Sequence, residues 1–305
     1  MAAVVMQRRL RLPLSFRAED ALAIHRRDPA SQAESVRGQV LDKGVCWQGR
    51  PARLRLRLTP RMALAELAVD AAPGERVAAE LPALKAMLGR MLGLQADVDA
   101  FEAQHAGHPV LGPLLHRQRG LRPPAMSTPF EALVWAIAGQ QISVAAALAL
   151  RRRMLEACGL RHSSGMLCFP DAAALVRLAP QELRAAGFSA SKISSVRAVG
   201  AAVLDGSLPL DGWAAAASVP VADIEPALLA IKGIGPWTVN YTLLRGFGWL
   251  DGSLHGDVAV RNALARLLRR ESVSPAQAQQ WLDEFSPWRA LVAAHLWASL
   301  SAKSF

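Results

Sequence analysis

The sequence predicts an α+β protein: a small antiparallel β-sheet domain with helices over residues 1–115, then an all-helical domain of two lobes over residues 116–305. Two observations predict this division. Short runs in the first hundred residues alternate apolar and polar side chains, the period of a β-strand, whereas apolar residues later recur at helical spacing. A polar stretch with several prolines and glycines, residues 105–129, separates the two parts.

Residues 53–58 give the clearest strand signal, because arginine and leucine alternate strictly and therefore lie on opposite faces. We also expect strands over residues 7–16 and 62–69, and a short strand or hairpin arm over residues 36–47. Residues 81–92 predict a helix with leucines at core spacing. The basic face of residues 53–58 has two interpretations, a DNA contact or the solvated face of a sheet, and the second is the commoner.

Helix-start signals recur through the second part. Ser127, Thr128 and Pro129 precede an expected helix over residues 130–138, and Ser143 precedes one that ends at Cys158. Further starts follow at Asp171, Pro180 and Ser189. The remaining expected helices cover residues 225–230, 258–269, 275–282 and 287–299.

The composition narrows the class of protein. The chain has 35 Lys and Arg residues against 25 Asp and Glu, a net charge of +10, which is typical of proteins that bind nucleic acid but also follows from genomic base bias. Its three scattered cysteines exclude a disulfide framework and a Cys-x-x-Cys metal site, and favour a reduced, cytoplasmic compartment. No run of about twenty apolar residues predicts a membrane span. We expect a monomer.

A glycine turn between two helices is the most informative motif. Gly233, Ile234 and Gly235 leave backbone N–H groups free at a helix N-terminus, where the helix dipole favours an anion such as phosphate. Lys232 and Thr238 flank the turn and can donate to phosphate oxygens. A Gly-x-Gly pair by itself is more often only a tight turn.

Four residues near this turn are candidates for chemistry on a nucleic-acid base. Trp237 and Tyr241, the only tyrosine, lie one helical turn apart and share a face. Asp257 precedes the expected helix over residues 258–269, and Trp297 lies in the last helix. Each has a structural interpretation as well: the rings as core aromatics, and Asp257 as a helix N-cap.

Four ordered segments resemble the helix–hairpin–helix DNA glycosylases, a family of base-repair enzymes. They are residues 129–143, 183–192, 231–262 and 286–297. Within that family the chain is most similar to the bacterial 3-methyladenine glycosylases of type II, which act in alkylation repair. The resemblance covers about residues 125–300, and the first hundred residues match only in their general character.

The resemblance implies roles for these residues. Asp257 falls at the catalytic carboxylate, and Trp237, Tyr241 and Trp297 fall at the aromatic walls of the base pocket. The hairpin would grip the DNA backbone, in the family often with a bound monovalent cation, through Lys232, Gly233, Ile234, Gly235 and Thr238.

Three positions refine what the family implies. Gln141 falls where a residue fills the gap left by the extruded base, although the relatives have an apolar side chain there. Trp237 takes the place of the Schiff-base lysine of bifunctional members, which implies base release without strand cleavage. Val258 departs from the pattern, because the relatives have an aromatic residue there.

We therefore expect a monofunctional glycosylase that flips out and excises alkylated purines, of the 3-methyladenine and 7-methylguanine type, from double-stranded DNA. No catalytic metal, organic cofactor or obligate protein partner is expected. Two alternatives stay open: a non-catalytic helix–hairpin–helix DNA-binding protein, and a glycosylase for deaminated or oxidised bases. Asp257 together with three rings argues against the first alternative. The second depends on the shape of the base pocket, which the sequence does not show.

Overall fold

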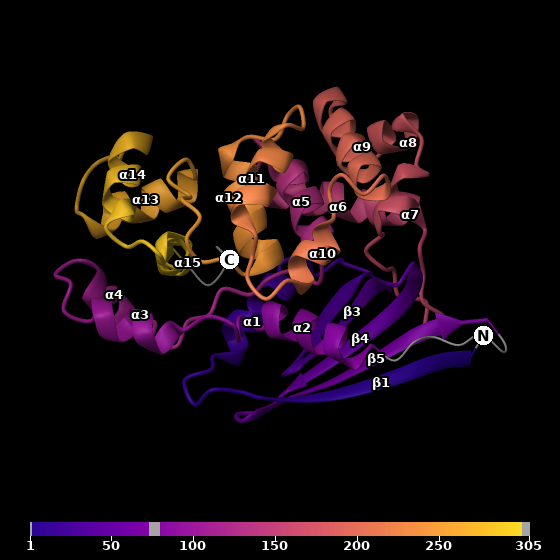
Figure 1. Ribbon diagram of the computed structural model, residues 1–305, viewed down its shortest axis with the longest axis horizontal. Coiled ribbons are helices and arrows are strands. Elements are labelled where there is room, and N and C mark those ends of the chain that lie inside the picture. The colour runs from indigo at the N-terminus through magenta and orange to yellow at the C-terminus, as the bar shows by residue number, and fades with distance from the viewer. Residues whose placement is uncertain (1, 73–79, 301–305) are drawn as a thin grey trace.

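The computed structural model describes residues 2–72 and 80–300. A five-stranded antiparallel sheet lies along one side of the molecule, and most helices lie above it (Figure 1). The strand order is β1-β5-β4-β3-β2. The predicted α+β class is confirmed. The strands are β1 (Ala2–Arg11), β2 (Glu34–Arg37), β3 (Val40–Trp47), β4 (Arg50–Leu58) and β5 (Met62–Ala71).

The alternation in β4 divides its side chains between two faces, as predicted. Leu54, Leu56 and Leu58 are buried beneath the sheet, whereas the arginines between them face outward. Arg55 donates to Asp42 on β3 at 2.9 Å, across an antiparallel pair. The outer face therefore contains ion pairs between neighbouring strands, which fits the solvated-face interpretation.

The predicted strand boundaries need two corrections. The strand expected over residues 7–16 begins earlier and stops at Arg11, which pairs with the first residue of β5, Met62. Residues 36–47 form no single strand but part of a hairpin, the second of the two expected arrangements. Gly38, with φ of 57°, turns the chain back so that Val36 on β2 pairs with Leu41 on β3. Only glycine adopts this backbone conformation at little cost.

Most helices follow the expected starts, but four short ones were not predicted: residues 18–23, 98–105, 111–117 and 210–215. Helices α3 (Val98–His105) and α4 (Leu111–Arg117) lie at and within the polar stretch. The N-terminal part also has α1 (Ala18–Ala23), the 3-10 turn η1 (Ile24–Arg26) and α2 (Leu81–Met91). The other helices are α5 (Pro129–Gly139), α6 (Val144–Cys158), α7 (Ala172–Val176), α8 (Pro180–Ala185), α9 (Ala190–Leu204), α10 (Leu210–Ala215), α11 (Val221–Leu229), α12 (Pro236–Thr242), the π-helical turn η2 (Leu243–Phe247), α13 (Val258–Leu267), α14 (Pro275–Asp283) and α15 (Arg289–Leu300).

Three hydrophobic cores hold these elements together. One lies between the sheet and α2, a second joins α5 through α11, and a third joins α3 and α4 to α13, α14 and α15. Helix α12 belongs to both helical lobes, because Val239 packs into the second core and Tyr241 into the third. The two helical lobes are thus confirmed, with α12 between them. The domain boundary at residues 115 and 116 stays a prediction.

A buried ionic cluster joins the sheet to the helices. Lys43 on β3 lies 2.7 Å from Glu131 on α5 and 3.1 Å from Glu34 on β2. Arg151 on α6 reaches both carboxylates, at 2.8 Å and 3.0 Å. Burial alone would raise the pKa of Glu131, but Lys43 and Arg151 lower it to about 2. The charges therefore balance across the junction.

Within the two described stretches, no helix has both the length and the apolar character that crossing a bilayer requires.

Candidate functional site at the junction of the two helical lobes

The predicted hairpin lies between α11 and α12, as the sequence indicated. Gly233 has φ of 90°, a conformation that side chains rarely adopt, and a Cβ there would collide with the Ser195 hydroxyl. The carbonyl oxygen of Lys232 accepts a hydrogen bond from Ser195 Oγ at 2.8 Å. The carbonyl of Gly233 accepts one from Gln140 Nε2 at 2.9 Å. Side chains of α9 and of the end of α5 therefore fix the turn.

The hairpin residues differ in accessibility. Lys232 and Gly233 are exposed, Gly235 is partly exposed, and Ile234 is buried. The Thr238 side chain is only 2% exposed, and its hydroxyl accepts from Gln140 Nε2 at 3.0 Å. Thr238 is the third residue of α12, so its backbone N–H has no partner within the helix. The hydroxyl keeps its own proton to donate, and the N–H is the second donor that Thr238 offers.

The carbonyl oxygens of Lys232 and Gly233 are candidate ligands for the monovalent cation that the family resemblance implies. The Lys232 and Gly233 carbonyls each accept one side-chain hydrogen bond, which uses one of two lone pairs and leaves the other free. Main-chain oxygens of this kind fit a hard monovalent cation. Among the described residues, no group of three or more His, Cys, Asp and Glu side chains could hold a metal ion.

Helix α12 brings the predicted rings together one turn beyond the hairpin. Trp237 and Tyr241 stack, with ring centroids 5.2 Å apart and planes inclined by 29°. Trp297 on α15 lies 6.2 Å from Tyr241, at an angle of 57°. All three rings belong to or pack against the core that joins α3 and α4 to the C-terminal helices, and Trp237 is the most accessible of them.

The Asp257 carboxylate accepts three hydrogen bonds at the edge of this aromatic group. Its Oδ1 accepts from the backbone N–H of Val260 at 2.9 Å and from the Trp297 indole at 3.1 Å. Its Oδ2 accepts from the Trp237 indole at 2.9 Å. Asp257 is thus the N-cap of α13, as one interpretation expected, and it also contacts two predicted pocket residues.

These bonds leave one defined direction in which the carboxylate can still act. An ionised carboxylate has about four lone-pair sites, two on each oxygen. The Val260 and Trp297 donors occupy both sites on Oδ1, and Trp237 occupies one on Oδ2. The remaining site belongs to Oδ2. That oxygen is the one available to a water molecule or a sugar.

Two further residues complete the ring group, and the sequence analysis did not single them out. The Trp135 indole on α5 donates to the Tyr241 hydroxyl at 2.9 Å. Arg245, in the π-helical turn η2, is fully buried with its guanidinium 5.2 Å from the Trp297 ring. It donates to the Pro124 carbonyl at 2.7 Å. Trp135 lies in one of the segments that resemble the family, but nothing in the local sequence indicates that it contacts Tyr241.

The other singled-out residues lie apart from the rings. Gln141 is exposed in the turn between α5 and α6 and has φ of 56°, next to Gln140, which contacts the hairpin. His255, which the sequence analysis did not single out, lies two residues before Asp257 and bonds to Ser253 at 2.9 Å. Val258 is 60% exposed, so it leaves one side of Asp257 open.

Comparisons with known proteins identify the family of the chain. The family model for HhH-GPD superfamily base excision DNA repair proteins matches residues 134–287. DNA-3-methyladenine glycosylase 2 of Escherichia coli is 32% identical over 192 residues, which are 61% of this chain and 63% of that protein. The match therefore spans just under two thirds of that relative's length.

Two solved structures share the fold. The 3-methyladenine DNA glycosylase of Archaeoglobus fulgidus gives a TM-score of 0.76 at 21% identity, covering 95% of this chain and 96% of that one. The 3-methyladenine DNA glycosylase of Schizosaccharomyces pombe, solved in complex with abasic DNA, gives 0.58 at 25% identity, covering 68% and 99%. The chain belongs to the HhH-GPD superfamily of base excision DNA repair proteins.

Proposed function

We propose that this protein is a monofunctional DNA glycosylase that flips alkylated purines out of duplex DNA and releases them, leaving an abasic site. One observation carries the proposal: the Asp257 carboxylate is bonded to two tryptophans whose rings, with Tyr241, form an aromatic group. A helix cap alone needs neither indole. The similarity to 3-methyladenine glycosylases supports the substrate class.

The rings suit a base that carries positive charge. A base in a duplex must leave the stack before its glycosidic bond can be reached, at a cost of a few kcal/mol. Alkylation at N3 or N7 makes a purine cationic, and the faces of Trp237 and Tyr241 attract cations by about 0.5–2 kcal/mol for each ring. The rings therefore offset part of the cost of flipping a damaged base.

The proposed chemical step uses the free side of Asp257 Oδ2. The bond between C1′ and the base nitrogen breaks with both electrons going to the base, so positive charge develops on the sugar. A carboxylate fixed by three donors stabilises that charge and accepts a hydrogen bond from the attacking water. An alkylated base departs as a neutral molecule, so the step requires no separate acid.

The same contacts support release without strand cleavage. A lyase step needs an amine that attacks C1′, and the family position for such a lysine holds Trp237. Its indole nitrogen carries no free lone pair, and its N–H already donates to Asp257. The hairpin N–H groups are proposed to hold a neighbouring phosphate, with the Lys232 and Gly233 carbonyls available to a monovalent cation.

Base release from duplex DNA treated with a radiolabelled methyl donor tests the proposal. Wild-type protein should free 3-methyladenine or 7-methylguanine, and Asp257→Asn should lower the rate by about 100-fold or more. Asparagine is a good N-cap, so the variant removes charge while α13 keeps its start. The exposed Asp99→Asn, at the first turn of α3, is the matched control and should keep the full rate.

Strand cleavage is measured on the same reactions with and without alkali. Breaks that appear only after alkali support the monofunctional assignment, whereas a trapped covalent complex with borohydride would refute it. Tight binding to methylated DNA without release of any base would favour the non-catalytic binding protein instead.

A further inference from the structure

The outer face of the sheet has a row of arginines that crosses all five strands. Arg37 on β2 pairs with Val40 on β3, which pairs with Arg57 on β4. Arg57 pairs with Leu64 on β5, and Leu64 pairs with Arg9 on β1. The neighbours of these residues along each strand pack into the core between the sheet and α2, so the row faces away from the helices. We call these five residues the arginine row.

The arginine row is long enough to contact several phosphates of a nucleic acid. Neighbouring strands lie about 4.8 Å apart, so its arginines repeat about every 10 Å and the row spans about 19 Å. A duplex of that length carries about 11 phosphate charges, one for about every 1.7 Å of its axis. All three arginines are exposed, and a groove of about 280 Å³ is lined by Arg9, Arg57 and Leu64. Phosphates can therefore reach the guanidinium groups from solvent.

Among the residues that the structure describes, no acid forms an ion pair with the arginine row. The rows beside it differ, since Arg55 lies 2.9 Å from Asp42 and Arg53 lies 3.9 Å from Glu66, which also lines the groove. Mixed charges of this kind suit a solvated face, whereas cations of one sign repel one another. The arginine row therefore gains from a partner of opposite charge.

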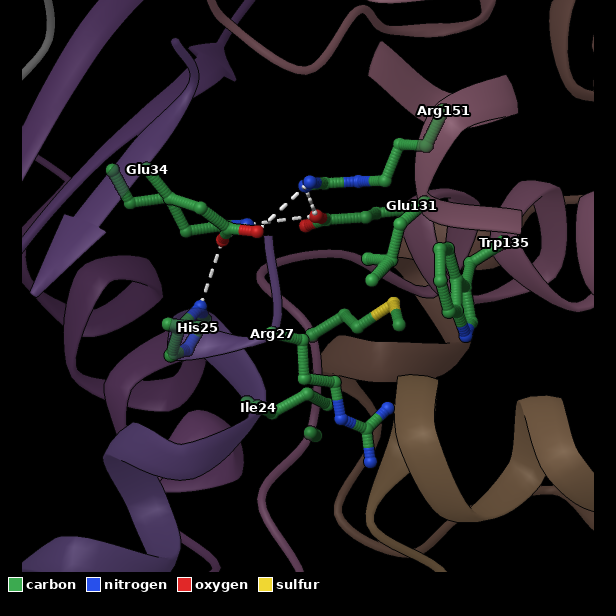
Figure 2. A pocket seen from close by; sticks show the side chains of 11 residues that line it. Ile24, His25, Arg27, Glu34, Glu131, Trp135 and Arg151 are labelled. Atoms are coloured by element: carbon green, nitrogen blue, oxygen red, sulfur yellow. Dashed lines mark hydrogen bonds and ion pairs between the residues drawn. The ribbon is translucent and has the colours of Figure 1, made fainter. Parts of the chain in front are cut away.

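On the buried side of the same sheet, the cations meet acids. Lys43 and Arg151 each contact Glu34 and Glu131, and Figure 2 shows the Arg151 guanidinium linked to both carboxylates. The sheet domain thus has its charges balanced inside and unbalanced on the arginine row. A surface with several cations of one sign is complementary to a polyanion.

The backbone of duplex DNA is the polyanion that this face fits best. Trp47 is the sole aromatic residue of the five strands, and it packs into the core, so the strands offer no ring on which an unpaired base could stack. Contacts with a duplex backbone need only donors and positive charge spread over a surface. The face therefore suits phosphates of a duplex better than a single strand.

The arginine row and the hairpin lie on different sides of the protein. Figure 1 shows α11 and α12, which hold the hairpin, on the other side of the sheet from the outer face. Duplex DNA is stiff over about 150 base pairs, so the segment held at the hairpin cannot also turn back onto the arginine row. A duplex on the row is therefore a second segment.

We propose that the arginine row is a second, sequence-independent binding surface for the backbone of duplex DNA, which holds one segment while the hairpin side holds another. The binding at the hairpin side rests on the proposed function, whereas binding at the row needs neither a damaged base nor Asp257. A protein that holds one segment keeps the second at a high effective concentration. It can then pass between segments without returning to bulk solution.

Energy transfer between two short labelled duplexes tests the inference. The donor duplex contains an abasic site, for the hairpin side, and the acceptor duplex is undamaged. Wild-type protein should bring the two together at about 50 mM salt and lose the acceptor steeply as salt rises. Arg9→Gln combined with Arg57→Gln should weaken capture of the acceptor by about 10-fold or more and lower its salt slope by about two.

The matched control removes the same charge elsewhere. Arg117→Gln combined with Arg177→Gln changes two exposed arginines at the ends of α4 and α7, and should capture the acceptor like wild type. Both double variants should release bases from a short methylated duplex at the wild-type rate, which also shows that they fold. Should the row variant not fold, Arg57→Gln alone should weaken capture by about threefold and Arg57→Lys, which keeps the charge, should leave it unchanged.

Four results would overturn the inference: no capture by wild type, capture that persists in the row variant, an equal loss in the control, or displacement of the acceptor by polyglutamate of equal charge as readily as by duplex DNA. The last would favour an acidic protein as the partner. Base release without capture would leave the proposed function standing. Capture of two undamaged duplexes, lost in the row variant, would support the arginine row even if no base were released.

Discussion

The Trp135 indole N–H lies 2.9 Å from the Tyr241 hydroxyl oxygen and donates to it, which ties α5 to α12 behind the ring group. Both side chains are buried. A Tyr241 hydroxyl that accepts this bond still has its own proton to donate. The bond therefore holds the Tyr241 hydroxyl in place without using its donor.

A double-mutant cycle on this pair measures the contribution of the bond. Trp135→Phe leaves the Tyr241 oxygen without its donor and opens space in the core, so we expect the free energy of unfolding to fall by about 1–3 kcal/mol. Tyr241→Phe removes the acceptor. The two changes together should cost about 1 kcal/mol less than their sum in denaturant titrations. Strict additivity would show that the bond does not couple the two helices.

The two indoles that bind Asp257 should contribute unequally to the rate of base release. Trp237→Phe removes the only observed donor to Oδ2, the oxygen proposed to face the sugar, whereas Trp297→Phe leaves Val260 bonded to Oδ1. We expect about a 10- to 100-fold loss of base release for Trp237→Phe and a smaller loss for Trp297→Phe. Rates measured at saturating protein separate chemistry from DNA binding. The reverse order would contradict the role given to Oδ2.

The hairpin offers a matched pair of glycines. Gly233→Ala places a methyl group against Ser195 Oγ at φ of 90°, so it should destabilise the fold by about 1–3 kcal/mol and weaken DNA binding. An alanine at Gly235 meets nothing within 4 Å, and Gly235 has φ of −113°. Gly235→Ala should therefore leave stability nearly unchanged. Melting curves and binding to an abasic-site duplex check both, and equal effects would refute the strain argument.

His295 should make stability depend on pH. It is fully buried among rings of α3 and α15, with Nδ1 2.8 Å from Gln118 Oε1, and burial lowers its pKa to about 3. The unfolded chain takes up a proton near pH 6.5 and the folded chain does not, so stability is present above pH 6.5 and is lost as the pH falls toward 3. Between pH 7 and pH 5 the loss should be about 2 kcal/mol.

Chemical denaturation at each pH tests this dependence. His295→Gln keeps a donor for Gln118 but cannot titrate in this range, so its free energy of unfolding should fall less steeply than that of wild type. The exposed His116→Gln should follow wild type. Identical slopes for all three proteins would show that other groups cause the acid sensitivity.

Local patterns were enough to predict most elements of the fold. The alternation of residues 53–58 predicted β4 and its two faces, and the Ser143 cap predicted the first residue of α6. Helices α3 and α4 were not predicted, because their sequence becomes helical only through packing on the C-terminal helices. Strand β1 was misplaced because its end depends on the partner strand β5.

The candidate site shows a similar limit. The spacing of Trp237 and Tyr241 predicted their shared face, and the stacked geometry confirms it. Asp257 had two interpretations, and the structure unites them in one carboxylate that caps α13 and binds both indoles. Trp135 and Tyr241 lie more than one hundred residues apart in sequence, so only the folded chain brings the indole to the hydroxyl.

The cluster formed by Lys43, Glu34, Glu131 and Arg151 has a consequence for how the protein unfolds. When the sheet separates from α5 and α6, the two acids and two bases lose their partners. Water can hydrate these four charges only after the whole junction has opened. Partial opening would leave charges without partners in apolar surroundings, which is strongly unfavourable. The sheet and the repair lobes should therefore melt in one cooperative transition, and an isolated helical part would retain Glu131 and Arg151 without Lys43.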